Sequence, residues 1–172
     1  MQFRVQNLTV HKFGGASVKD ADAVRNVESI LQKCLVSPAV VVVSAMGKTT
    51  NKLEQVFSTL VSDGFDKSLE ELNEIVVAHQ KVIDALSIEL DLRELFVTAL
   101  KNSSQLDDIN AAYDELVASG EDASTKILFA YLDSNSWDVE WRDVRDIIET
   151  DERHNSARVD ERRLDEMGLN LR

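Results

Sequence analysis

Two short apolar segments near the start of the chain have the composition of buried β-strands. Leu8–Lys12 is followed by a pair of glycines, and Ala39–Ser44 is a run of valines that ends in a loop of small and hydroxyl residues. Between them, Val18–Leu35 has the composition of a helix. A strand, a helix and a second strand in this order predict a βαβ unit with parallel strands, whose loops lie at the carboxyl edge of the sheet.

Helical spacing of apolar residues dominates the middle of the chain. The predicted helices are Leu53–Val61, Leu69–Leu86, one from Asp91 to a break at Ser103–Ser104, one from Leu106 to Gly120, and one that begins at Glu121. We expect these helices to form an insertion that covers the crevice at the sheet edge.

An alternation of apolar and polar residues returns at Trp137-x-Val139-x-Trp141. This pattern predicts a third strand over Trp137–Asp143, with both indoles on the same face. Packing between this face and a helix is favoured over stacking of the indoles on a ligand.

Composition limits the class of protein. The chain has 172 residues, of which 44% are hydrophobic, so one domain with one core is expected. The formal net charge is −12, which argues against nucleic acid as a partner. No secretory signal opens the chain, and no apolar run reaches the roughly 20 residues that span a bilayer. The single cysteine, Cys34, fits a protein of the reducing cytoplasm.

The loop after the first predicted strand has the residues of an anion site. Gly14 and Gly15 let backbone N–H groups approach an anion closely, Lys12 adds a positive charge, and Ser17 adds a hydroxyl donor. A helix that begins just after this loop favours negative charge there. Glycine pairs also close ordinary strand-to-helix turns, so the loop alone leaves both interpretations open.

The loop after the second strand is expected at the same edge, which would bring Ser44, Gly47 and Thr50 to one crevice with the first loop. Neither loop has the P-loop pattern, because no glycine lies five residues before Gly47, and no Gly-x-Gly-x-x-Gly occurs. Nucleotide sites of the P-loop and Rossmann types are therefore excluded.

The motifs resemble those of the amino-acid kinase family, and within it the aspartate kinases. Four separated motifs carry the resemblance: Lys12-Phe-Gly-Gly-Ala-Ser17, Val43-Ser-Ala-Met-Gly-Lys-Thr-Thr-Asn51, Gly120-Glu121 with Ser124-Thr125, and Trp141-Arg-Asp-Val-Arg-Asp146 followed by Thr150-Asp151. The resemblance covers about residues 8–160. It implies an α/β fold, a three-layer αβα sandwich with a mainly parallel sheet of the carbamate kinase-like type, present here in incomplete form.

The resemblance also implies roles for the residues of these motifs. Lys12, Gly14, Gly15 and Ser17 would hold the phosphoryl group of ATP. Ser44, Thr50, Glu121 and Arg145 would hold L-aspartate, with the Arg145 guanidinium on a carboxylate and Glu121 on the ammonium group. The carboxylate of aspartate is ionised at neutral pH and attacks a γ-phosphoryl group without a general base. Lys12 is the expected catalytic residue.

Simpler interpretations exist for several of these residues. Arg145 has acidic neighbours in sequence and would pair with them on a solvated surface. Glu121 would be favoured at a helix start by the helix dipole alone. Ser44 and Thr50 would serve as turn or cap residues. His79 falls on the apolar stripe of a helix, which favours a core position over a ligand role.

The family's ATP-binding half is not found in this sequence, because the only glycine after Gly120 is Gly168. Residues 1–172 are therefore expected to be the N-terminal, amino-acid-binding part of an aspartate kinase, which would use ATP with Mg²⁺, form a homo-oligomer, and act early in lysine, threonine and methionine synthesis. No histidine or cysteine has zinc-site spacing. Another kinase of the superfamily, for glutamate or uridylate, and a non-catalytic binding module are the alternatives.

Overall fold

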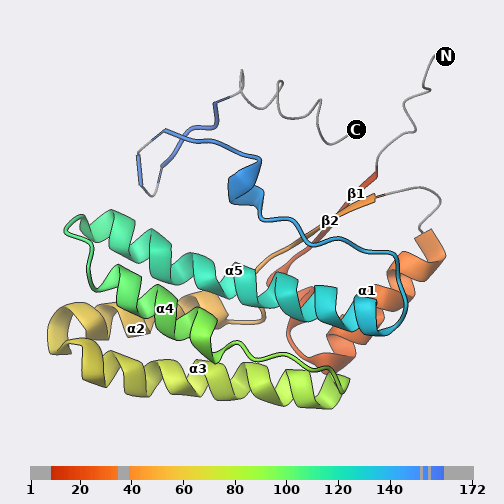
Figure 1. The fold of residues 1–172 in the computed structure, drawn as a ribbon, viewed down its shortest axis with the longest axis horizontal. Coiled ribbons are helices and arrows are strands. Elements are labelled where there is room, and N and C mark those ends of the chain that lie inside the picture. Colours follow the sequence, from red (N-terminus) through yellow and green to blue (C-terminus); the bar gives the residue numbers. More distant parts are fainter. Residues whose placement is uncertain (1–8, 35–38, 152, 155, 161–172) are drawn as a thin grey trace.

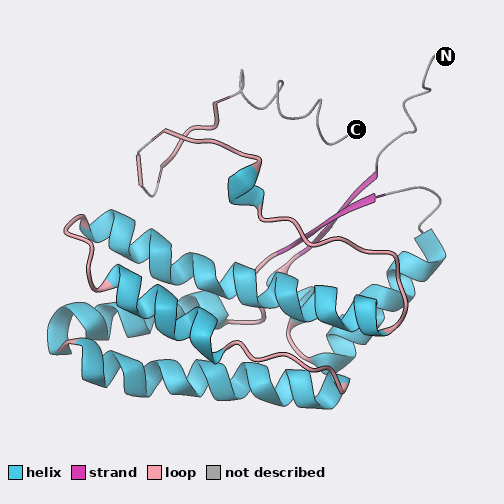
Figure 2. Cartoon of the chain, in the orientation of Figure 1, coloured by secondary structure: helices cyan, strands magenta, loops and turns pink. Residues whose placement is uncertain are grey.

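The computed structural model describes residues 9–34, 39–151, 153–154 and 156–160. Figure 1 shows a mostly helical chain in which a small sheet lies beside a layer of long helices, and Figure 2 separates helix, strand and loop by colour. In chain order the elements are β1 (Thr9–Phe13), the 3-10 turn η1 (Gly15–Val18), α1 (Ala21–Cys34), β2 (Ala39–Val43), α2 (Thr49–Asp63), α3 (Phe65–Leu86), α4 (Arg93–Ser103), α5 (Ile109–Ser134) and the 3-10 turn η2 (Val144–Asp146).

The βαβ unit predicted from the two apolar runs is confirmed. β1 and β2 are parallel neighbours, in register from Thr9 opposite Ala39 to Phe13 opposite Val43, and α1 connects them. The connecting helix begins later than predicted. Residues 15–18 form a tighter turn first, and the Asp20 carboxylate then accepts a hydrogen bond from the Ala23 N–H at 2.8 Å, which caps α1.

The two faces of this sheet differ in exposure. Phe13 and Val43 are buried in the core that the helices share, whereas Val10, Val40 and Val42 on the opposite face are 62%, 41% and 44% exposed. Lys12 is exposed on the same face as these three valines, since side chains alternate along a strand. Within the described residues no helix covers this face, so the three-layer arrangement expected from the family resemblance is present only as a sheet with one covered face.

The third strand predicted over Trp137–Asp143 is wrong. These residues form no strand, and among the described residues the sheet has β1 and β2 only. Both indoles instead point at helices: the Trp137 Nε1 donates to the Glu28 carboxylate at 3.0 Å, and the Trp141 Nε1 donates to Thr125 Oγ1 at 3.1 Å. The alternating pattern therefore reflects a segment that lies along helices and places every second side chain against them.

The helices from α2 to α5 follow β2 without an intervening strand, as predicted for the insertion, and they pack as two pairs. α2 and α3 are joined at Gly64, whose φ of +91° is in the range that favours glycine, and α4 packs along α5. Their shared core includes these fully buried residues: Leu53, Leu72, Ile75, Ile83, Phe96, Leu100, Leu116 and Ile127. No helix among the described residues is long and apolar enough to cross a membrane.

The predicted helix boundary at Gly120 is also wrong. α5 runs unbroken through this residue, and it begins at Ile109, where the Asp108 carboxylate accepts from the Asn110 and Ala111 N–H groups. Gly120 is buried at the centre of the helix. A glycine here is explained by tight packing against a neighbouring loop and not by a turn.

Candidate functional site

The loop between β1 and η1 carries the predicted phosphate residues. Gly14 is the N-cap of η1 with an extended backbone, and the Ser17 N–H donates to its carbonyl at 2.8 Å. The Lys12 Nζ lies 3.8 Å from the position that a Cβ on Gly14 would take, so the ammonium group lies over the glycine loop. Lys12, Gly14, Gly15 and Ser17 are thus neighbours in one turn, in which the lysine and the serine are exposed and the two glycines are half-buried.

The two loops at the carboxyl edge of the sheet are in direct contact. The Ser44 N–H donates to the Phe13 carbonyl at 3.1 Å, and the Gly47 N–H donates to the Gly15 carbonyl at 3.0 Å. A Cβ on Gly15 would lie 2.5 Å from the Ala45 carbonyl oxygen, which is closer than real Cβ contacts. Gly15 is therefore required for the junction of the loops, in addition to any approach to an anion.

The second loop turns sharply into α2. Gly47 has a φ of +57°, and the buried Thr49 Oγ1 donates to the Met46 carbonyl at 2.7 Å, which closes the turn. Thr50, the residue that the resemblance singles out, is half-buried in the first turn of α2, and Ser44 is half-buried directly after β2. Thr49 thus supplies the hydroxyl group that closes this turn. Sequence alone did not distinguish it from Thr50.

Glu121 lies against this loop because α5 comes very close to it. A Cβ on Gly120 would lie 3.1 Å from Leu53 Cδ1 and 3.2 Å from both Ala45 Cβ and Thr49 Cγ2, so only glycine lets the helix approach this far without displacing its neighbours. The next residue then accepts a hydrogen bond: the Ala45 N–H donates to Glu121 Oε1 at 3.3 Å. The structure brings Glu121 next to the Ser44–Lys48 loop, and its role in binding aspartate stays a prediction.

The guanidinium of Arg145 is paired with the carboxylates of Asp143 and Asp122. Its Nε and Nη2 donate to both oxygens of Asp143, at 2.9 Å and 2.6 Å, and Nη2 also donates to Asp122 Oδ2 at 2.7 Å. The Asp143 carboxylate accepts the Arg145 backbone N–H at 2.9 Å as well. These hydrogen bonds lower the pKa of Asp143 and raise that of Arg145. The pairing with an acidic neighbour is the alternative interpretation of Arg145, and a role in aspartate binding stays a prediction.

Asp122 is a residue that sequence reasoning missed. It follows Glu121 directly and gives Arg145 a partner from α5 that is 23 positions away in the sequence. No pattern along the chain links the two, because the pairing depends on how the segment after α5 folds back along the helix. The contact of Gly120 with the loop was missed for a similar reason, although an apolar helix interrupted by glycine was a signal for it.

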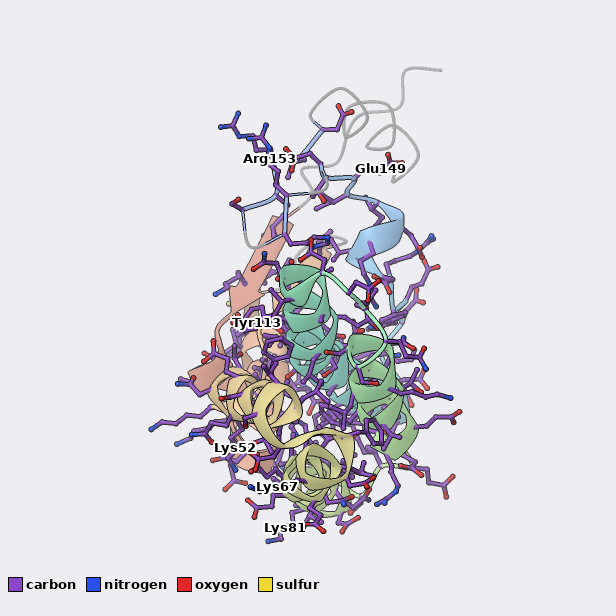
Figure 3. The ribbon with its side chains drawn as sticks, turned by 90° about the vertical axis from the view of Figure 1, so that its left-hand side faces the viewer. Lys52, Lys67, Lys81, Tyr113, Glu149 and Arg153 are labelled. Carbon is purple, nitrogen blue, oxygen red and sulfur yellow. The ribbon has the colours of Figure 1, made fainter. Side chains whose placement is uncertain are left out.

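Two hollows with polar lining residues lie away from the carboxyl edge of the sheet. One hollow of about 410 Å³ between α4 and α5 is lined partly by Arg145 and Lys126, and one of about 550 Å³ is lined partly by Lys52 and Lys81. Figure 3 shows Lys52, Lys67 and Lys81 on the side of the molecule where α2 and α3 lie. Neither hollow is lined by Lys12 or Glu121.

The histidines and acidic residues do not form a metal centre in the described part of the chain, where no group of three His, Cys, Asp or Glu side chains is placed to hold a metal ion. His79 is 3% exposed and packs against Phe96, and its Nδ1 bonds to the Ile75 carbonyl at 2.8 Å. The core position predicted for His79 is confirmed. Burial lowers its pKa.

Known proteins with similar sequences and structures are aspartokinases. Aspartokinase 2 of Arabidopsis thaliana is 35% identical over 130 residues, which are 72% of this chain and 24% of that protein. Lysine-sensitive aspartokinase 3 of Escherichia coli is 28% identical over 160 residues, 91% of this chain and 35% of that protein. The chain thus spans about a quarter to a third of the length of these relatives.

The fold agrees with these sequence matches. The crystal structure of E. coli aspartokinase III in complex with aspartate and ADP superimposes with a TM-score of 0.80 at 29% identity, over 96% of this chain and 38% of that one. The model of the amino acid kinase family matches residues 7–168. This chain belongs to the amino acid kinase family and is an aspartokinase-like domain that corresponds to about a third of its relatives.

Proposed function

We propose that this chain is the amino-acid-binding part of an ATP-dependent aspartate kinase, which transfers the γ-phosphoryl group of ATP to the side-chain carboxylate of L-aspartate and forms 4-phospho-L-aspartate. The observation that carries the proposal is the meeting of three elements at one edge of the sheet. The hydrogen bond between Gly47 and Gly15 joins the two loops, and that between Ala45 and Glu121 adds α5.

The residue types at this edge suit the reaction. A carboxylate acceptor of pKa about 3.9 is already ionised at neutral pH, so the site needs no general base. Phosphoryl transfer then depends on positioning and on neutralising the charge of the phosphoryl oxygens. Lys12 supplies positive charge over the Gly14–Gly15 turn, in a chain whose net charge is −12. In the proposed mechanism Lys12 stabilises the phosphoryl group during its transfer.

The proposal assigns the two substrates to two sides of this junction. Lys12, Gly14, Gly15 and Ser17 face the phosphoryl group of ATP, which arrives with Mg²⁺. Ser44, Thr50 and Glu121 face L-aspartate, with the carboxylate of Glu121 on its ammonium group. One oxygen of Glu121 accepts from the Ala45 N–H, and the other oxygen is the one assigned to the substrate.

Arg145 is the least supported of the predicted aspartate ligands, because two carboxylates already occupy its guanidinium. The wider context is proposed on the family alone: an enzyme of the cytoplasm, a homo-oligomer, and a first step toward lysine, threonine and methionine. Since the chain spans about a third of its relatives, the binding of aspartate is the part of the activity proposed for residues 1–172 themselves.

Isothermal titration calorimetry of the chain with L-aspartate tests the proposal. We expect saturable binding that Glu121→Gln weakens, because an amide does not neutralise an ammonium group. Glu89→Gln is the matched control, since Glu89 is exposed in the turn before α4 and far along the chain from the site. MgATP is expected to bind poorly and to yield no measurable phosphorylation of aspartate.

Other results would favour the alternatives. Binding of glutamate or uridylate with exclusion of aspartate would point to another kinase of the superfamily. Tight aspartate binding that is insensitive to Glu121→Gln would place the ligand elsewhere. Turnover of ATP with aspartate by the isolated chain would show that it holds a complete active site, contrary to the proposal that it supplies one part.

A further inference from the structure

The segment after α5 is fastened to the helix turn that follows Glu121. Trp141 donates from Nε1 to Thr125 Oγ1 at 3.1 Å, and the Lys126 Nζ lies 4.8 Å from the centre of the Trp141 ring. Four residues later Arg145 pairs with Asp122. Successive contacts therefore attach residues 141–145 to one side of α5.

α5 is also attached to the Ser44–Lys48 loop, and this second attachment places Glu121. Gly120 packs on Leu53, Ala45 and Thr49, and Glu121 accepts from Ala45. An α-helix turns 100° per residue, so Gly120 points to nearly the opposite side of the helix from Asp122 and Lys126, and Glu121 lies between these two sides. The turn that carries Glu121 is thus held from two sides, by the Ser44–Lys48 loop and by the segment with Arg145.

The Arg145 side chain is 57% exposed, and its guanidinium bridges Asp143 and Asp122; we call this bridge the clamp. The guanidinium binds Asp143 through two parallel donors and shares Nη2 with Asp122, and these two carboxylates are only 19% and 23% exposed. Bidentate pairs of arginine and carboxylate are the stronger and more directional class of ion pair. Asp143 is itself held by the backbone N–H of Arg145, so the clamp includes the first turn of η2.

We infer that Arg145 is a positioning residue of the acceptor site: it fixes Asp122, and through Asp122 the turn of α5 that presents Glu121 to the Ala45 N–H. It acts on the substrate through Glu121 and makes no contact with the substrate. This inference rests on the proposed function for the identity of the substrate. The contact between Glu121 and Ala45 can be measured without any substrate.

Arg145 could be a direct ligand of aspartate or a clamp, and the two roles predict different effects of removing the Asp122 carboxylate. If Arg145 bound the substrate carboxylate, Asp122 would compete with it, and Asp122→Asn would strengthen aspartate binding or leave it unchanged. If Arg145 is a clamp, Asp122→Asn and Arg145→Met break the same contact. Each should then weaken binding, and the double variant should be no worse than either single one.

The first experiment measures hydrogen exchange of the Ala45 amide by NMR in the chain without ligand. Arg145→Met and Asp122→Asn are each expected to raise the exchange rate of this amide by about threefold to tenfold, within the range of coupling between residues of one network. Arg142→Met is the matched control, because Arg142 is exposed and its guanidinium pairs with Glu140 of its own segment at 2.8 Å. Unchanged exchange at Ala45 in Arg145→Met overturns the inference.

The second experiment measures the dissociation constant for L-aspartate by calorimetry in the same variants. Arg145→Met is expected to raise it about threefold to tenfold, and to have no further effect in a Glu121→Gln background, since it acts through Glu121. If Arg145→Met weakens aspartate binding equally in the wild type and in the Glu121→Gln variant, Arg145 contacts the substrate directly and the inference is wrong. If the wild-type chain binds no aspartate, the proposed function fails, and the exchange of Ala45 still decides the role of Arg145.

Discussion

The backbone of Gly15 approaches Ala45 so closely that a methyl group on Gly15 would lie 2.5 Å from the Ala45 carbonyl oxygen. This approach brings the loops after β1 and β2 into contact and allows Gly47 to donate to Gly15 at 3.0 Å. The shape of the candidate site therefore depends on a backbone contact between two glycine-containing loops.

Gly15→Ala is expected to destabilise the fold by about 1–3 kcal/mol, because the added methyl group meets backbone that cannot move without separating the loops. Gly14→Ala is the control. Its Cβ would meet only the flexible end of Lys12, at 3.8 Å, and the backbone of Gly14 is extended with a φ of −74°. Urea unfolding followed by circular dichroism measures both. Equal midpoints for the two variants would contradict the contact.

Gly120→Val is expected to destabilise the chain by about 1–3 kcal/mol, because its side chain would overlap Leu53, Ala45 and Thr49. Ala118→Val is the control on the exposed side of the same helix. Valine has a better helix propensity than glycine but a worse one than alanine, so propensity alone predicts the opposite order. Thermal unfolding of the two variants separates packing from propensity.

His79 should make the free energy of unfolding decrease as the pH is lowered. Burial lowers the pKa of this histidine in the folded state, while in the unfolded chain it takes up a proton near its ordinary pKa of about 6.5. Below that pH the unfolded state binds the extra proton, so the free energy of unfolding decreases as the pH falls, by up to about 1.4 kcal/mol per pH unit.

Urea unfolding of the chain between pH 7.5 and pH 5 measures this decrease, and His79→Leu should reduce it. The Ile75 carbonyl keeps its bond within α3 in that variant, so the fold is expected to survive. His154→Gln is the comparison, since His154 is exposed and pairs with Asp114 at 3.2 Å. An identical pH dependence in the wild type and His79→Leu would show that other groups are responsible.

Glu28 joins α1 to the end of α5. Its two carboxylate oxygens accept from the Tyr131 hydroxyl at 2.8 Å and from the Trp137 Nε1 at 3.0 Å. Glu28→Ala should cost about 1–3 kcal/mol, because it leaves two partly buried donors without an acceptor. Gln32→Ala, on the exposed side of α1, is expected to be nearly neutral. Urea unfolding followed by tryptophan fluorescence measures the effect.

The exposed valines of the sheet should promote self-association. Val10, Val40 and Val42 form an apolar face on β1 and β2, whose outer edges pair with no other strand among the described residues, and such surfaces recruit partners. Sedimentation velocity over a range of concentrations is expected to show oligomers that Val40→Thr/Val42→Thr reduces. Val77→Thr is the control, since Val77 is 53% exposed on α3. A monomer at all concentrations would contradict this prediction.

Much of the local structure followed from the sequence. The two strands, the helix between them and the helices that became α2, α3 and α4 were predicted, because periodicity and turn residues act over a few positions. The residues of α5 were predicted to be helical as well, but as two helices divided at Gly120. The four motifs also led to the family, with residues Lys12 to Ser17 and Ser44 to Thr50 in neighbouring loops. Local chemistry was sufficient for these conclusions.

Only the tertiary structure decided the rest. Gly120 resembles a helix end in the sequence, but α5 continues through it, since its missing side chain makes room for Ala45 and Thr49. Residues 137–143 alternate like a strand, yet their indoles find partners on α1 and α5. The pairing of Arg145 with Asp122 joins residues 23 positions apart. Such contacts depend on how distant segments pack, and no local pattern of residues encodes them.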